Sequence, residues 1–257
     1  MNRIENAFKN GKVLIPFLTG GDPNVDVTYE LIKVMAENGA DMIELGIPFS
    51  DPVAEGPAVQ EADLRALAAK TTTDSIFDMV ERLRKEIDIP IVLLTYMNPI
   101  YVYGIKRFME KCAQVGVDGV MVPDVPYEEK SELEIDCKEN GVCLISMTSL
   151  TTKDRIGMIS KEAEGYVYCI STIGALENVD KVKNDIADMA QLVNEATDVP
   201  VVVGFDGSNV SDAVAISEVP DGIVLENAIV NLVAQYGEDA ISHVADFVKK
   251  LKTGMIR

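Results

Sequence analysis

The chain has 257 residues, of which 47% are apolar and 25% charged, and its formal net charge is −19. This length suits one α/β barrel, and the composition is that of a globular protein that can bury a single core. Nucleic acid and anionic membrane surfaces both attract basic patches, which this acidic sequence lacks, so we expect neither as a partner.

Cysteine and histidine usage narrows the possible chemistry. The four cysteines form no CxxC pair, and Cys143 and Cys169 lie in apolar runs, so we expect free buried thiols and a cytoplasmic location. The single histidine, His243, lies off the apolar stripe of its helical pattern, which predicts a surface position. Because there is no second histidine, a multi-histidine metal site is excluded. The sequence shows no signal peptide and no apolar run approaching the ~20 residues of a membrane span.

Short apolar runs recur along the whole sequence and predict strands. Continuous apolar runs, rather than alternating ones, indicate strands that are covered on both faces, as in parallel sheets. In chain order the runs are 13–18, 42–45, 91–94, 119–122, 142–145, 166–170, 201–203 and 222–225. Helical spacing of apolar residues fills the intervals, for example over 27–35, 76–83 and 189–193.

The regular alternation predicts the fold class. Eight units over the chain give roughly 32 residues each (257/8), the size of a βα repeat. A short turn motif with aspartate also recurs just before a strand, at Asp41, Asp118 and Asp221. An open doubly wound sheet is the alternative, but no glycine-rich dinucleotide fingerprint follows the first run. We therefore predict a single (β/α)8 TIM barrel domain over residues 1–257.

Two acidic residues follow the second predicted strand, at the barrel end where active sites lie. Glu44 is a carboxylate inside an apolar strand, where loss of hydration would raise its pKa and suit it to acid–base chemistry. The plainer interpretation is a buried glutamate paired with a lysine or a backbone donor. Glu55 lies in the Pro- and Gly-containing loop that follows, and two carboxylates at one mouth suggest separate acid and base roles.

The segment ELGIPFSDPVAEGPAVQEA, residues 44–62, closely resembles the signature of the tryptophan synthase α subunit family. IPFLTGGDP, LTYMNPIYVYG, VPDVPYEE and GYVYCIS extend the resemblance over nearly the whole chain. It implies a lyase that cleaves indole-3-glycerol phosphate by a retro-aldol reaction, without metal or organic cofactor. The family's catalytic glutamate matches Glu44, and the family's second carboxylate, usually aspartate, matches Glu55.

The resemblance also implies further site residues and a partner. Substrate-pocket positions of the family match Phe17, Leu94, Tyr96, Met121, Tyr168, Gly204 and Phe205. Ordinary barrel packing is the alternative role for such large apolar residues. Asp51, Asn98, Asp124 and Pro126 match positions near the contact with a tryptophan synthase β subunit, which implies a heterotetramer of two α and two β subunits.

The sequence departs from the family where barrels usually bind phosphate, in the loops after the late strands. Acids replace family glycines at Glu177, Asp206 and Glu226, Leu176 replaces a threonine, and Asn227 replaces a serine. A carboxylate ~4 Å from a phosphate charge costs on the order of 4 kcal/mol at an effective dielectric near 20.

Three functions are compatible with this sequence. The first is the family's lyase reaction with a β subunit. The second is a paralogue whose ligand lacks phosphate or carries a cation, which includes a polyamine or a divalent ion. The third is a non-catalytic partner that binds a β subunit. The surviving carboxylates favour the first.

Overall fold

A computed structural model describes residues 2–170, 179–205 and 209–255. Nine parallel strands form its sheet. They are β1 (Val13–Thr19), β2 (Ile43–Gly46), β3 (Ile91–Leu94), β4 (Gly119–Met121), β5 (Cys143–Leu144), β6 (Ser146–Ser149), β7 (Val167–Ile170), β8 (Val201–Phe205) and β9 (Gly222–Leu225). The predicted runs 91–94 and 222–225 match the observed strands, the ends of the other runs differ by one or two residues, and β6 lies beyond the run 142–145 and was not predicted.

The sheet closes into the predicted barrel. Its strand order is β5-β4-β3-β2-β1-β9-β8-β7-β6, and every neighbouring pair is parallel. The two strands at the ends of this order, β5 and β6, are separated in sequence by Ile145 alone. They are therefore two halves of one barrel strand, of which one half pairs with β4 and the other with β7.

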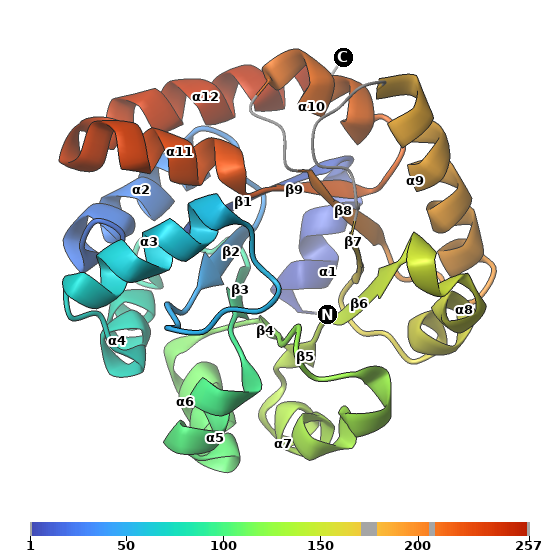
Figure 1. Cartoon of the computed structure of the whole chain (residues 1–257), viewed down its shortest axis with the longest axis horizontal. Coiled ribbons are helices and arrows are strands. Elements are labelled where there is room, and N and C mark those ends of the chain that lie inside the picture. The colour runs from blue at the N-terminus through green and yellow to red at the C-terminus, as the bar shows by residue number, and fades with distance from the viewer. Residues whose placement is uncertain (1, 171–178, 206–208, 256–257) are drawn as a thin grey trace.

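Helices surround the strands in a ring, as Figure 1 shows in a view along the barrel. The helices that come after β1 in the chain are α2 (Val25–Glu37), α3 (Pro57–Ala68), α4 (Thr73–Leu83), α5 (Met97–Tyr103), α6 (Ile105–Val115), α7 (Ser131–Asn140), α8 (Lys153–Lys161), α9 (Val179–Asn194), α10 (Val210–Ser217), α11 (Asn227–Tyr236) and α12 (Ala240–Met255). Short 3-10 turns are η1 (Phe8–Asn10), η2 (Tyr127–Glu129), η3 (Leu150–Thr152) and η4 (Gly237–Asp239).

Two apolar clusters explain why the strand runs are continuous rather than alternating. On β1, Val13, Ile15 and Phe17 belong to the cluster that fills the barrel, whereas Leu14 and Leu18 belong to the cluster between the sheet and the helices. Successive side chains of a strand point to opposite faces, so both faces of this strand must be apolar. The first helix, α1 (Arg3–Ala7), contributes fully buried Ile4 to the inner cluster and lies behind the strands in Figure 1.

The recurring aspartates do more than shape a turn. The backbone N–H of Asp41, Asp118 and Asp221 donates to the carbonyl of Leu14, Ile91 and Val201, respectively, at 2.8 to 3.0 Å. Each aspartate carboxylate accepts a hydrogen bond from the backbone N–H of that same strand residue, at 2.7 to 2.9 Å. The motif therefore fastens the start of one strand to its neighbour at the end of the barrel opposite the mouth.

Replacing Asp118 by alanine is expected to lower the free energy of unfolding by about 3 kcal/mol, because its carboxylate also holds the largely buried Arg84 guanidinium at 2.6 Å. Thermal denaturation measures the effect, expected as a drop of about 10 °C in Tm. Asp88→Ala is the matched control, since Asp88 pairs with Arg3 but its side chain is 91% exposed, and we expect a loss below about 1 kcal/mol. Equal losses from both variants would contradict this role for the motif.

Other expectations are met in the described ranges. All four cysteines are free and buried, and His243 is exposed and stacked on Tyr236 with ring centroids 3.7 Å apart. No helix in this part of the chain combines the length and apolar character needed to cross a membrane.

Candidate active site

Glu44 lies in β2 and faces the interior of the barrel. Its neighbours Ile43 and Leu45 pack outward against the helices, whereas Met42 belongs to the inner cluster. The Glu44 side chain is fully buried, and neither carboxylate oxygen has a hydrogen-bond partner among the described residues. The lysine or backbone partner of the plainer interpretation is thus not found there. Burial, reinforced by the nearby carboxylates of Glu226 and Glu55, raises the pKa of Glu44 well above its ordinary value.

Glu55 precedes α3 and is partly buried at the barrel mouth. Burial and the neighbouring Asp63 carboxyl raise the pKa of Glu55 to about 8. Tyr96 helps to position this loop, because its hydroxyl lies beside the Glu55 carboxyl and accepts a hydrogen bond from the backbone N–H of Ala54 at 3.1 Å. The Tyr96 ring in turn lies 5.3 Å from that of Phe49.

A cavity of about 210 Å³ opens at the C-terminal ends of the strands. Its lining residues come from the loops and strand ends around the mouth: Phe17, Ala54, Glu55, Gly56, Val59, Leu94, Pro123, Met147, Tyr168, Ile170, Gly204, Phe205, Glu226 and Asn227. The wall is mostly apolar, which suits a flat heterocycle. The only charged side chains among these described lining residues are the acids Glu55 and Glu226.

The structure brings most of the expected substrate residues to this cavity. Phe17, Leu94, Tyr168, Gly204 and Phe205 line it directly. Gly204 is needed for close approach, because a Cβ added there would lie 2.2 Å from the Tyr168 hydroxyl.

Two expected pocket residues lie behind the cavity wall. Tyr96 and Met121 are almost fully buried and are absent from the described lining. Tyr96 supports the Glu55 loop, and Met121 packs in the inner apolar cluster with Leu94 and Tyr168. Their positions correspond to support of the site rather than direct contact with a ligand in this cavity.

Glu226 follows β9 and lies directly before α11, at a loop where barrels commonly hold phosphate. The Tyr168 hydroxyl donates a hydrogen bond to Glu226 Oε1 at 2.8 Å. Asn227, the first residue of α11, lines the cavity beside it. The carboxylate of Glu226 therefore faces the cavity rather than solvent. Glu177 and Asp206, the two other acids expected in this region, lie outside the described residues, as does Leu176.

Several contributors to the site were not predicted from the sequence. Met147 and Ile170 line the cavity from β6 and β7, and Pro123 lines it from the loop after β4. Asp63 is the most consequential omission, because it is a buried acid in contact with Glu55. Its spacing four residues after buried Val59 was the available signal, since an acid on the apolar face of a helix is unusual.

The acids of the site do not form a metal centre within the described ranges. No group of three or more His, Cys, Asp or Glu side chains in those ranges could hold a metal ion. What the arrangement provides is a pair of carboxyls with raised pKa values, one inside the barrel and one at its mouth, around an apolar cavity. Such a pair is suited to moving protons to and from a bound substrate.

A (β/α)8 barrel that carries this pair at its C-terminal mouth has the architecture of a barrel enzyme of the acid–base type. Comparison with known proteins places it more closely. The family model for the tryptophan synthase alpha chain matches residues 4–255. The chain therefore belongs to the tryptophan synthase alpha chain family, the α-subunit enzymes of tryptophan biosynthesis.

Individual relatives agree with this assignment over their whole length. The chain is 40% identical to the tryptophan synthase alpha chain of Halalkalibacterium halodurans, with 100% of this chain and 96% of the relative covered. It is 37% identical to that of Lacticaseibacillus casei, with 99% and 96% covered. The crystal structure of the alpha chain from Legionella pneumophila superposes with a TM-score of 0.90 at 29% identity, covering 100% of this chain and 98% of the other.

Proposed function

We propose that this chain is a carbon–carbon lyase that cleaves indole-3-glycerol phosphate into indole and glyceraldehyde 3-phosphate, with Glu44 and Glu55 as its catalytic residues. The observation that carries the proposal is the placement of these two carboxyls, one buried in β2 and one at the cavity wall, in a member of this family. The apolar wall around Phe17 and Leu94 suits the indole ring.

The raised pKa of Glu44 suits it to both proton transfers of a retro-aldol cleavage. As a neutral acid, Glu44 gives a proton to indole C3, which leaves a positive charge on the ring. As the resulting carboxylate, it takes the proton of the side-chain hydroxyl while the bond between C3 and that carbon breaks. The electron pair of the broken bond returns to the ring, an aldehyde forms, and Glu44 recovers its proton. Glu55 accepts the indole N–H and stabilises the cation between the two transfers.

Release of indole from indole-3-glycerol phosphate tests this function directly. Steady-state rates should be measured for the wild-type chain alone and with a tryptophan synthase β subunit. We expect indole release above background in at least one condition, dependent on Glu44. A rate at background in both conditions would contradict the proposal.

The same mouth offers a surface for a β subunit, and we propose assembly into a heterotetramer in the cytoplasm. Val53, Tyr101 and Val102 are 70–80% exposed, although they are large and apolar, and exposed Asp51 and Asn98 adjoin them in sequence. Apolar side chains left in water near a site are typical of a protein interface. Co-elution with a β subunit should be lost in a Val53→Asp, Val102→Asp double variant. If co-elution survives, the surface is wrong.

One observation favours a second candidate function. The carboxylate of Glu226 faces the cavity beside Asn227, at a barrel's usual phosphate position. A paralogue with a non-phosphorylated or cationic ligand would use that carboxylate as an acceptor. Calorimetry against spermidine, Mg²⁺ and Ca²⁺ tests it, with the expected heat of binding lost in Glu226→Gln. Absence of binding by all three, together with turnover of the phosphorylated substrate, would exclude this candidate. A chain that co-elutes with a β subunit but shows no turnover and no ligand binding would be a non-catalytic partner.

A further inference from the structure

A second buried acid lies next to Glu55 and has no part in the reaction described above. Asp63 is in the middle of α3, and its side chain is only 3% exposed. The buried residues of the same helix include Val59, Ala62 and Ala66, which are apolar. A carboxyl in such a position is unfavourable unless it is hydrogen-bonded, so its contacts must account for it.

The carboxyls of Asp63 and Glu55 lie beside each other and act on each other's pKa. Nevertheless, Glu55 Oε2 and Asp63 Oδ2 are both buried without a hydrogen-bond donor in the described part of the chain. Two ionised carboxylates that lie beside each other repel, and neither has a hydrogen to donate to the other. A single proton held between them removes the repulsion and gives one oxygen of each group a partner.

The surroundings of the pair act in both directions, and burial, which favours the protonated form, is the largest effect on both carboxyls. Polar groups nearby, which are the Tyr96 hydroxyl beside Glu55 and the Phe49 backbone N–H and Thr19 hydroxyl beside Asp63, favour the ionised forms and only partly offset burial. The other charged group that acts on Asp63 is the carboxylate of Asp22, which disfavours a second negative charge.

The nearest basic group on α3 does not neutralise the pair. Arg65 forms a bidentate ion pair with Asp22, in which Nε donates to Oδ1 at 2.8 Å and Nη2 donates to Oδ2 at 2.7 Å. Its guanidinium is therefore already matched to another carboxylate. Glu44, whose carboxyl also lies near Glu55, is an acid and does not neutralise the pair.

We propose that Asp63 shares a single proton with Glu55 and thereby controls when Glu55 presents a full carboxylate to the substrate's N–H group. Asp63 does not line the cavity and so acts as a positioning residue, through Glu55. This inference rests on the proposed function only for its effect on turnover. The pair carries one negative charge while it holds the proton, and the proton leaves to solvent as the pH rises.

The shared proton fixes the sign of the pH dependence. The pKa of Glu55 is raised to about 8 and that of Asp63 to about 6, mainly by burial. Glu55 is therefore mostly protonated at pH 7, and its carboxylate form increases as the pH approaches 8. Removing the charge of Asp63 lowers the pKa of Glu55, so the carboxylate form should appear at lower pH.

Carbon-13 NMR of protein labelled at the glutamate carboxyl tests the shared proton without any turnover. The Glu55 signal is assigned by its loss in Glu55→Gln and followed from about pH 5 to about pH 9, a range that brackets the raised pKa. We expect its midpoint near pH 8 in the wild type and about one to two units lower in Asp63→Asn. Asp63→Ser serves as a second variant with the same expected direction if the asparagine variant folds poorly.

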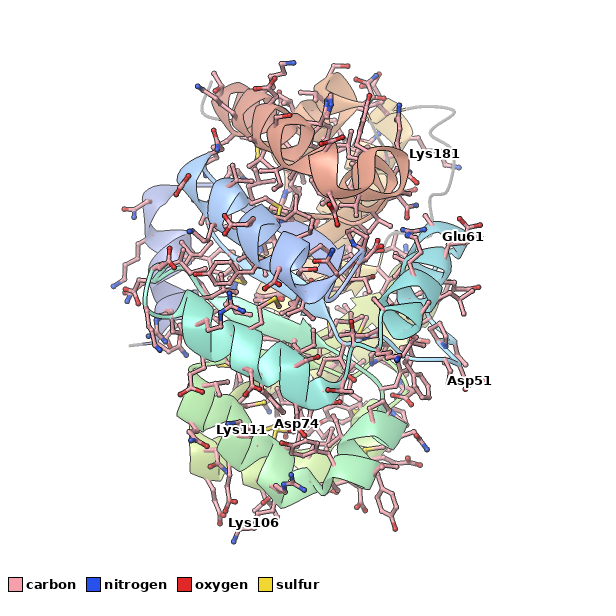
Figure 2. The ribbon with its side chains drawn as sticks, turned by 90° about the vertical axis from the view of Figure 1, so that its left-hand side faces the viewer. Asp51, Glu61, Asp74, Lys106, Lys111 and Lys181 are labelled. Atoms are coloured by element: carbon pink, nitrogen blue, oxygen red, sulfur yellow. The ribbon has the colours of Figure 1, made fainter. Side chains whose placement is uncertain are left out.

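Glu61→Gln is the matched control, because Glu61 lies on the same helix but is exposed, and Figure 2 shows it at the outer surface. We expect no shift of the Glu55 midpoint in this variant. A shift as large as that in Asp63→Asn would mean that general electrostatics act on Glu55, and would overturn the proposal. An unchanged midpoint in Asp63→Asn would overturn it as well.

The effect on the reaction is a separate measurement. In Asp63→Asn, the rise of kcat/KM with pH should move downward by the same one to two units, which gives up to about tenfold faster indole release at pH 7. Glu61→Gln should retain the wild-type profile. A wild-type chain without turnover but with the NMR shift would contradict the lyase function and leave the shared proton in place. Turnover without the NMR shift would support the lyase function and overturn the shared proton.

Discussion

Replacement of Glu44 by glutamine is expected to reduce indole release by about a thousandfold, within the range for loss of a general acid–base group. Glutamine keeps the size of the side chain, so the cavity and the inner apolar cluster should be preserved. It can neither give a proton to indole C3 nor take one from the hydroxyl. The steady-state rate at substrate saturation measures the loss, and Glu61→Gln should retain the wild-type rate.

The same substitution is expected to make the folded protein more stable. The folded state favours the protonated form of Glu44, because both oxygens are buried without a partner among the described residues. At pH 7, protonating a carboxyl whose ordinary pKa is 4.5 costs about 3 kcal/mol, at about 1.4 kcal/mol per unit of pH. Glutamine carries no such cost, and we expect a gain of up to about 3 kcal/mol in the free energy of unfolding at pH 7.

The pH dependence gives this prediction its sign. A carboxyl with a raised pKa binds its proton more strongly in the folded state, so stability falls as the pH rises from about 4.5 toward the folded pKa. The advantage of Glu44→Gln should therefore be small at about pH 5 and larger at about pH 7, as measured by urea denaturation at both values. A variant that is less stable than the wild type at neutral pH would show that Glu44 has a stabilising partner.

The barrel was predictable because its strands are covered on both faces. The inward and outward residues of β1 belong to different apolar clusters, which makes the run 13–18 continuous in the sequence. The division of the fifth barrel strand was not predictable. The apolar run 142–145 ends one residue beyond β5, and the other half, β6, has the largely polar sequence SMTS, which carries no strand signal. The first half pairs with β4 and the second with β7.

Some residues of the site could be predicted from the sequence and others could not. Glu44 could be assigned to the barrel interior, because both faces of its strand are covered and an acid there must be buried. Asp63 was missed despite its spacing four residues after Val59, because α3 buries this acid while its apolar neighbour Leu64 is 62% exposed. The usual assumption that apolar residues face the core would bury Leu64 and expose Asp63, the opposite of what the structure has. The direction of Glu226 depends on its hydrogen bond from Tyr168, a residue 58 positions away, which no local pattern encodes.

Replacement of Glu226 by glycine is expected to raise kcat/KM for indole-3-glycerol phosphate by between about tenfold and about a thousandfold. The upper value corresponds to removal of a repulsion of about 4 kcal/mol between a carboxylate and a phosphate ~4 Å apart. The lower value allows for screening, since Glu226 is only partly buried in an open cavity. Glycine also exposes the first N–H groups of α11, and the N-terminus of a helix attracts anions.

Two further variants separate charge from space. Glu226→Gln removes the charge and keeps both the length of the side chain and an acceptor for Tyr168. It should recover part of the gain if repulsion is the main effect, and none if the side chain only blocks the phosphate. Tyr168→Phe removes the hydroxyl that holds Glu226 and serves as the control for loss of that hydrogen bond.

The Glu226→Gly variant also distinguishes the lyase function from the second candidate, a paralogue with a non-phosphorylated or cationic ligand. If the natural ligand is phosphorylated and the wild type binds it despite Glu226, the Glu226→Gly variant should bind inorganic phosphate more tightly than the wild type. It should also cleave indole-3-glycerol phosphate faster. If the natural ligand is neutral or cationic at that end, the glycine variant should lose its binding of that ligand, because the acceptor facing the cavity is gone. A glycine variant with unchanged kcat/KM, unchanged phosphate affinity and unchanged binding of cations would show that Glu226 has no influence on the ligand. In that case the carboxylate beside α11 would have a structural role, which includes its hydrogen bond from Tyr168.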